Sequence, residues 1–241
     1  MQTDLNKKNN SDMIFVYCGG KCGSSTLQKT FINNNYNSIH VHSNSYYQNN
    51  LKNTDTIFDV IDNSCKKYNK VYMIDSYRTP IERKISSFFQ NITIHLPNYN
   101  DLTIDNIIDF FNVNFIDHIE EYHSIDEVLQ YYGMPLFTEF NFEQRYNIIE
   151  KDNKIFIKLL FKDIQKWNII LSKIFQKNII MHSDNLTKDK SINNLYEEFQ
   201  KKYKIPRSYI ENILKNDNNF KIYNTKCEQE EYINRWLELS Y

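Results

Sequence analysis

Glycines, a lysine and hydroxyl side chains stand together near the N-terminus, in the stretch IFVYCGGKCGSSTL from Ile14 to Leu27. Glycines let the backbone approach a ligand closely. Successive backbone N–H groups at a helix start form a nest for an anion, and hydroxyls add donors. The stretch therefore predicts a phosphate-binding loop, although an ordinary glycine turn capped by serine is the simpler alternative. The candidate binding residues are Gly20, Lys21, Cys22, Gly23, Ser24, Ser25 and Thr26.

The position of the lysine bears on which phosphate chemistry the loop serves. A nucleotide kinase of the usual kind has its lysine directly after the last glycine, followed by Ser or Thr. Here Ser24 follows Gly23, and Lys21 precedes it. The strand-like segment KVYMID ends in Asp75, which resembles the magnesium-holding aspartate of such kinases. A nucleotide or small-molecule kinase therefore stays an alternative.

A second basic segment, YRTPIERKISSFF, follows the buried run that ends near Asp75. Arg78 offers a fork of donors that suits phosphate. Pro80 is placed as the first residue of a helix, and Ser86 adds a hydroxyl about two turns into that helix. The two side chains could clamp a phosphate group. Taken alone, the segment also fits an ordinary surface helix start.

Together, the two segments resemble the sulfotransferases that use 3′-phosphoadenosine 5′-phosphosulfate (PAPS). GKCGSST is similar to the loop of that family, in which the lysine precedes the glycine. The family also has an arginine at the end of its third strand, then a proline, a second arginine and a serine. Arg78, Pro80, Arg83 and Ser86 match those spacings. The chain is most similar to the capsular polysaccharide synthesis proteins of that group. Its segment KNIIMHSDNLTKDK resembles the late strand of the family.

The resemblance implies an enzyme that transfers a sulfonate group from PAPS to a hydroxyl or amine of an acceptor, with carbohydrate as the expected acceptor class. The product of the donor would be adenosine 3′,5′-bisphosphate (PAP), and the scheme requires no metal. Lys21 would stabilise charge on the leaving phosphate, while Arg78 and Ser86 would hold the 3′-phosphate. The chain departs from the family at Gly20, where many members have proline.

A general base must take the proton of the acceptor. His40 and His42 stand two residues apart in SIHVHS, on one face of a predicted strand and near its carboxyl end. His42, nearer that end, is the preferred candidate, and structural histidines are an equally good interpretation. The other candidates are His123 and the two glutamates of TEFNFEQR, Glu139 and Glu143, a segment expected to cover the acceptor side.

Strand-like and helix-like segments alternate along the chain, which predicts an α/β fold with a central parallel sheet flanked by helices. A polar tail is expected over residues 1–12 and a single domain over 13–241, helical in its C-terminal third. The expected strands are Met13–Cys18, Ser38–Ser43, Lys70–Asp75, Lys154–Leu160 and Asn178–Ser183. The expected helices include Ser24–Asn34, Asp55–Lys67, Pro80–Gln90, Thr103–Gln130 and Asp163–Phe175.

Bulk composition limits the partners of the chain. A net charge of −1 argues against a nucleic-acid binder. No segment suits a signal peptide or membrane span, so we expect a cytoplasmic protein. The four cysteines lack metal-ligand or disulfide spacing, and a redox pair of Cys18 and Cys22 is the minor alternative to plain thiols. Two further functions stay alternatives. The chain could be a non-catalytic binding protein that keeps the sulfotransferase fold, and a less favoured alternative is an acyl or glycosyl transferase.

Overall fold

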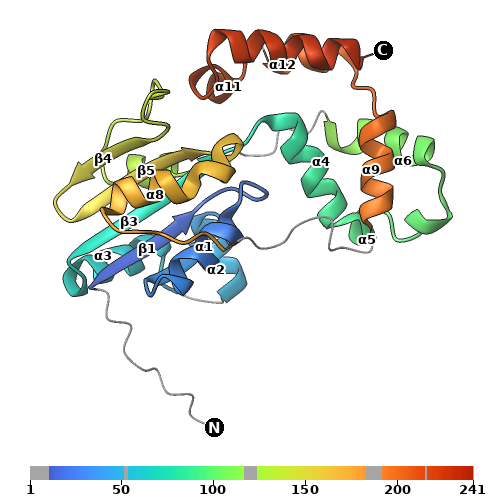
Figure 1. Cartoon of the computed structure of the whole chain (residues 1–241). Helices are drawn as coiled ribbons and strands as arrows, with labels where there is room; N and C mark the ends of the chain where they lie inside the picture. The colour runs from blue at the N-terminus through green and yellow to red at the C-terminus, as the bar shows by residue number, and fades with distance from the viewer. Residues whose placement is uncertain (1–10, 52–53, 117–123, 183–191, 215, 241) are drawn as a thin grey trace. The chain divides into compact units, whose positions relative to one another are not determined.

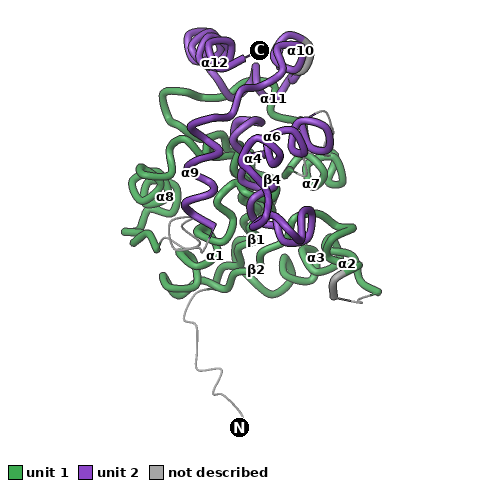
Figure 2. Tube along the Cα trace, turned by 90° about the vertical axis from the view of Figure 1, so that its right-hand side faces the viewer, with its two compact units in different colours: residues 1–77, 122–185 green, residues 78–121, 186–241 purple. Residues whose placement is uncertain are grey.

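The computed structural model describes residues 11–51, 54–116, 124–182, 192–214 and 216–240. These residues form two compact units, which Figure 2 colours separately. The sheet unit comprises residues 1–77 and 122–185, and the helical unit comprises residues 78–121 and 186–241.

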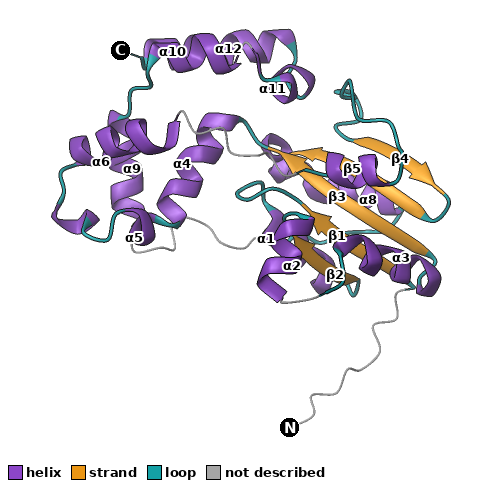
Figure 3. Ribbon diagram, turned by 180° about the vertical axis from the view of Figure 1, so that it is seen from behind, coloured by secondary structure: helices purple, strands orange, loops and turns teal. Residues whose placement is uncertain are grey.

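Five strands make up the sheet of the sheet unit, in the order β2-β1-β3-β5-β4 (Figures 1 and 3). All neighbouring pairs are parallel except β4 with β5, which is antiparallel. The α/β class predicted from the sequence is thus confirmed, and the central sheet is mostly parallel. The strands are β1 (Asp12–Tyr17), β2 (Asn37–Val41), β3 (Lys70–Tyr77), β4 (Asn147–Lys151) and β5 (Lys154–Leu160).

The three central strands, β1, β3 and β5, are buried on both faces, as is typical of parallel sheets that carry helices on either side. Helices α1 (Ser24–Asn33) and α8 (Trp167–Phe175) contribute Leu27, Phe31 and Leu171 to the core on one face. Helices α3 (Ile57–Lys67) and α7 (Asp126–Tyr131) contribute to the core on the other face. A further helix of this unit, α2, spans Asn44–Leu51.

The helical unit is built around aromatic side chains. Phe88 and Phe89 of α4 (Pro80–Gln90) pack in one buried cluster with Phe111, Phe199 and Tyr203. Pro80 is at the start of α4, as expected, because its fixed φ suits a first helical position. The other helices are α5 (Ile92–His95), α6 (Ile104–Phe111), α9 (Asn193–Lys202), α10 (Arg207–Tyr209), α11 (Asn218–Ile222) and α12 (Lys226–Glu238).

The long helix expected over Thr103–Gln130 is wrong as one element. Helix α6 ends at Phe111, and Asn112–Ile116 continues as a π-helical turn. Ser124 and Ile125 are not helical, and α7 begins only at Asp126. The backbone N–H of Ile125 donates to the carboxylate of Asp75 at 3.0 Å, so a tertiary contact fixes the start of α7.

The strand expected over Asn178–Ser183 is also wrong for its described part, residues 178–182. Backbone N–H groups in this segment donate to side chains and not to a neighbouring strand: Ile179 to Ser172, Ile180 to Asn34, and His182 to Thr30. Ser183 lies outside the described residues. Strand β4 was not expected, because NIIEK is short, mostly polar and only partly buried at the sheet edge.

Candidate functional site

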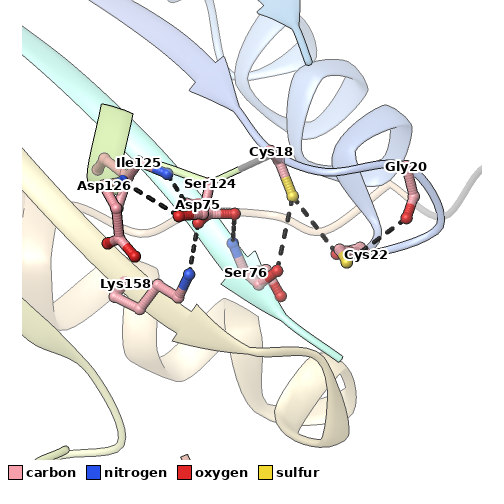
Figure 4. Close-up of polar contacts among 9 residues, drawn as sticks. All are labelled: Cys18, Gly20, Cys22, Asp75, Ser76, Ser124, Ile125, Asp126 and Lys158. Atoms are coloured by element: carbon pink, nitrogen blue, oxygen red, sulfur yellow. Dashed lines mark hydrogen bonds and ion pairs between the residues drawn. The ribbon is translucent and has the colours of Figure 1, made fainter. Parts of the chain in front are cut away.

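The phosphate-loop segment lies where the sheet changes its direction of growth. From β1 the chain moves to β2 on one side, and from β2 it returns to β3 on the other side of β1. Ligands of open α/β sheets bind at the carboxyl ends of the two strands that flank such a point. Cys18 follows β1, and its Sγ lies 3.8 Å from the carbonyl oxygen of Ser76 near the end of β3 (Figure 4). The loop therefore starts at the position where this sheet would hold a ligand.

The loop backbone turns through two left-handed residues before it enters α1. Lys21 has φ 67° and Gly23 has φ 84° with ψ 15°. Gly23 is the N-cap residue of α1 and offers no side-chain cap, and the first turn of α1 contains no acidic residue. The N–H groups of a first helical turn have no partner within the helix and carry a partial positive charge. This end of α1 therefore suits an anion.

Gly23 cannot be replaced without displacing its neighbours. A Cβ atom at Gly23 would lie 2.8 Å from Cη2 of Trp167 and 3.2 Å from the ring of Phe161. The indole of Trp167 is fully buried, and its Nε1 donates to the carbonyl of Leu160 at 3.0 Å. Gly23 thus meets two requirements, a positive φ and the close approach of a fixed aromatic ring, and the packing of Trp167 shapes the loop.

The loop side chains divide into two groups by burial. Gly20, Lys21, Gly23 and Ser25 are partly exposed, while Cys22, Ser24 and Thr26 are buried. The Cys22 thiol points inward, 3.6 Å from the carbonyl of Gly20, so Cys22 could offer a ligand only its backbone N–H. Burial raises the pKa of the Cys18 thiol well above its usual value, so Cys18 is held in its unreactive thiol form.

His42 lies beside the start of the loop, one residue beyond the end of β2. Its Nδ1 is 2.7 Å from the carbonyl oxygen of Cys18. A carbonyl only accepts, so Nδ1 carries the proton, and in the neutral ring the lone pair lies on Nε2. That tautomer is the one a general base requires at Nε2.

His40 packs against His42, with ring centroids 4.5 Å apart and an angle of 86° between the rings. Desolvation by burial, helped by the nearby charge of His42, lowers the pKa of His40 to about 4. Its Nε2 is buried with no hydrogen-bond partner among the described residues. His40 is therefore the more structural of the two histidines, and His42 is the one that contacts the loop.

Asp75 forms a buried ion pair with Lys158 of β5 (Figure 4). Oδ2 of Asp75 accepts from Nζ of Lys158 at 2.5 Å and from the backbone N–H of Ile125 at 3.0 Å. Oδ1 accepts from the N–H of Ser76 at 2.6 Å. The carboxylate is thus neutralised and hydrogen-bonded through both oxygens. Lys158 was not among the residues predicted from the sequence, although a lysine inside the apolar strand KIFIKLL itself indicates a buried partner of opposite charge.

Glu127 of α7 is a second residue near the loop that was not predicted from the sequence. It accepts a hydrogen bond from the hydroxyl of Tyr17, the last residue of β1, and a longer one from the N–H of Asn44 at 3.4 Å. Burial, reinforced by Glu127, raises the pKa of Tyr17. Tyr17 is thus a neutral donor that ties the end of β1 to α7. No sequence spacing links residues 110 positions apart.

Arg78 and Ser86 belong to the helical unit, whereas the phosphate loop and both histidines belong to the sheet unit. Arg78 is the residue after Tyr77, the last of β3, and Ser86 is buried within α4. Burial raises the pKa of the Tyr196 hydroxyl, and the charge of Arg78 and its hydrogen bond act against that rise. Arg78 and Tyr196 of α9 are therefore neighbours within the helical unit.

The structure describes two of the three remaining candidate bases. His123 lies outside the described residues. Glu139 and Glu143 are exposed on the segment that precedes β4. Arg145, the last residue of TEFNFEQR, forms a two-pronged ion pair with Asp163 at 2.9 and 2.6 Å.

No family model, curated protein sequence or solved structure matches the chain. Fold and site together define an α/β protein with an anion-suited loop at the switch point of a mostly parallel sheet. Within the described ranges, no helix has the length and apolar character needed to cross a membrane.

Proposed function

We propose that the protein is a PAPS-dependent sulfotransferase that modifies a hydroxyl or amine of a carbohydrate acceptor. The observation that carries the proposal is the loop between β1 and α1, where Lys21 precedes the helix-capping Gly23 and His42 hydrogen-bonds to the first loop residue, Cys18. PAPS, when bound, supplies the sulfonate group and a bisphosphate leaving group. The P-loop-like sulfotransferase fold belongs to the same proposal, which the resemblance of both segments supports.

The loop residues fit an anionic donor on two counts. The uncapped start of α1 favours negative charge. A Cβ atom placed at Gly20 would meet nothing within 4 Å, so there is open space above the loop backbone next to Lys21. Gly20, Lys21, Gly23 and the Ser25 hydroxyl can therefore face a phosphate group, while Ser24, Thr26 and Cys22 support the loop from inside.

Two side chains have chemical roles in this proposal. Lys21 places a positive charge at the loop, where it can stabilise the negative charge that develops on a leaving phosphate; removing such a donor typically costs about 10²–10³-fold in rate. His42 accepts the acceptor's proton at Nε2 while its Nδ1–H stays bonded to Cys18. A positioned base of this kind typically contributes about 10²–10⁴-fold. The expected contacts of Arg78 and Ser86 with the 3′-phosphate rest on the resemblance.

The ion pair of Asp75 argues against the kinase alternative. A kinase would need this carboxylate to hold magnesium. Both oxygens of Asp75 already accept hydrogen bonds, and the ammonium group of Lys158 neutralises its charge at 2.5 Å. Breaking a buried pair of this kind is strongly unfavourable. A divalent cation would therefore have to displace Lys158 before Asp75 could bind it.

Isothermal titration calorimetry with PAP, compared with ATP plus magnesium, tests the proposal. We expect PAP to bind and ATP with magnesium to bind more weakly. We expect Arg78→Ala to weaken PAP binding and Lys21→Ala mainly to lower turnover. Lys29→Ala is the matched control, because Lys29 is an exposed lysine of α1 outside the loop. Binding of ATP with magnesium without binding of PAP would support the kinase. PAP binding without sulfonate transfer to any saccharide would support a non-catalytic binding protein.

A further inference from the structure

A cavity of about 620 Å³ lies in the sheet unit, lined by residues 137–144 and 146–149. Small-molecule sites typically measure about 300–1,000 Å³, so the cavity has the size of a binding site. It is formed by the segment that leads into β4 and by the first residues of β4 itself. We refer to it as the 137–149 pocket.

The pocket combines aromatic rings with carboxylates. The rings of Phe142 and Tyr146 line it and are only half-buried. Glu139 and Glu143 line it as well and are exposed. Carboxylates only accept hydrogen bonds, which suits a ligand rich in hydroxyl donors. Aromatic rings offer a flat apolar face to C–H groups. A saccharide presents both kinds of surface, and a lining that has two glutamates and no lysine or arginine favours a ligand without negative charge.

Hydrogen bonds hold the pocket-forming segment in one shape. Asn147 accepts from the N–H of Asn141 at 2.8 Å and donates to the carbonyl of Glu139 at 2.5 Å. Asn141 in turn accepts from the N–H of Gln144 at 2.9 Å. The ion pair of Arg145 with Asp163 anchors the segment to the 3-10 turn after β5. A preorganised segment loses less conformational entropy when a ligand binds.

The pocket-forming segment enters β4 at the same end of the sheet at which the phosphate loop leaves β1. Because β4 is antiparallel, its first residue, Asn147, pairs with Lys158 near the carboxyl end of β5. Lys158 pairs with Asp75 of β3, next to β1, from which the loop departs. Three strand intervals separate β4 from β1, a distance of about 14 Å at the usual strand spacing. The pocket is therefore too distant to hold the reacting group of an acceptor bound at the loop.

One short segment contacts both regions. Phe161 packs next to Gly23 of the loop, and Nζ of Lys162 lies 5.6 Å from the ring centroid of Phe142 in the pocket. The next residue, Asp163, holds Arg145. The 3-10 turn Phe161–Lys166 thus contacts both the phosphate loop and the segment that forms the 137–149 pocket.

We propose that the 137–149 pocket is a remote acceptor subsite, which binds an uncharged saccharide unit of an oligosaccharide whose reacting unit lies at the phosphate loop. This inference rests on the proposed sulfotransferase function. Binding energy from a remote unit can hold and orient the reacting one. The protein would accordingly prefer oligosaccharides over monosaccharides.

Saturation-transfer NMR with uncharged hexasaccharides of glucose and of N-acetylglucosamine, without PAP, tests the subsite directly. We expect at least one hexasaccharide to bind to the wild type, and Phe142→Leu and Glu143→Gln to weaken that binding at least ten-fold. Phe142→Leu keeps apolar volume but removes the ring. Glu150→Gln is the control, since Glu150 is an exposed glutamate of β4 outside the pocket lining, and should bind as the wild type does. Failure of both hexasaccharides to bind, or equal binding by the pocket variants, would overturn the proposal.

The PAP titration, repeated on the same variants, separates this inference from the proposed function. PAP binding that is unchanged in Phe142→Leu and Glu143→Gln, together with lost saccharide binding, supports both. Saccharide binding without PAP binding would remove the sulfotransferase proposal and with it the assignment of the pocket as an acceptor subsite. PAP binding with no saccharide signal would leave the donor site and overturn the subsite alone.

Discussion

Nζ of Lys158 lies 2.5 Å from Oδ2 of Asp75 across the neighbouring strands β5 and β3, and both side chains are fully buried. The pair occupies the edge of the sheet from which the phosphate loop departs. In a kinase, the carboxylate at the position of Asp75 would hold a metal cation, but here it is paired with the ammonium group of Lys158. The same pair secures the start of α7, because Asp75 also accepts from the N–H of Ile125.

Removing one partner of this pair should destabilise the fold. We expect Lys158→Met to lower the free energy of unfolding by about 3–5 kcal/mol, because it leaves the Asp75 carboxylate buried without a counter-charge. The double variant Lys158→Met, Asp75→Asn should lose less than the sum of the two single losses. Urea denaturation followed by circular dichroism gives the values. The control is Lys202→Met at the exposed pair with Glu198, where we expect less than about 1 kcal/mol. Additive losses would contradict the coupling.

Replacement of Gly23 should distort the loop more than backbone strain alone predicts. Gly23 and Gly133 both have positive φ, but only at Gly23 does a Cβ atom meet a ring, 2.8 Å away. We expect Gly133→Ala to cost about 1–2 kcal/mol and Gly23→Ala to cost about 1–3 kcal/mol more. Gly20→Ala, which meets nothing within 4 Å, should leave stability nearly unchanged. Thermal unfolding of the three variants measures the differences. Equal losses at Gly23 and Gly133 would mean that Trp167 does not constrain the loop.

His42→Asn should separate catalysis from loop shape. The asparagine amide can still donate to the carbonyl of Cys18, but the acceptor nitrogen Nε2 is lost. We expect turnover to fall at least about 100-fold with PAP affinity unchanged, as measured by product formation and calorimetry. His40→Gln, which alters the neighbouring ring, should retain most of the turnover. A His42→Asn variant as active as the wild type would remove His42 from the mechanism.

His40 should make stability depend on pH in the acidic range. Its pKa is lowered from 6.5 to about 4 in the folded protein, first by burial and then by His42. Between these values the unfolded chain binds a proton that the folded chain does not, so stability falls as pH falls from 6.5 to 4. The slope is at most about 1.4 kcal/mol per pH unit from this group. Urea titrations at several pH values should show a shallower slope for His40→Gln. An identical slope in both proteins would assign the effect to other groups.

Much of the fold follows from local sequence patterns. Buried apolar runs predict β1, β3 and β5, and Pro80 predicts the start of α4, because these signals lie within a few residues of each other. Strand β4 was not predicted, because a short strand at the sheet edge lacks a clear pattern of apolar residues. The false strand at residues 178–182 has the apolar pattern, but the N–H groups of Ile180 and His182 bond to the side chains of Asn34 and Thr30, 146 and 152 positions away. Local sequence contains no record of such tertiary partners.

The candidate site also has a part that local sequence predicts and a part that depends on contacts between distant residues. The loop residues are contiguous, so their glycines, lysine and hydroxyls indicate anion binding directly. The contact of His42 with Cys18 joins residues 24 positions apart, and that of Lys158 with Asp75 joins residues 83 apart. Spacing in the sequence could suggest His42 only as a residue near a strand end. Its tautomer and its direct contact with the loop required the structure.

The contact of Trp167 with Gly23 also gives the chain a built-in optical reporter. Indole emission responds to changes in its surroundings, and this indole lies directly beneath the loop. The other tryptophan, Trp236, belongs to the helical unit, so replacing it with phenylalanine would leave Trp167 as the single indole of the chain. Ligand arrival at the loop could then be followed in real time by fluorescence, with no label attached.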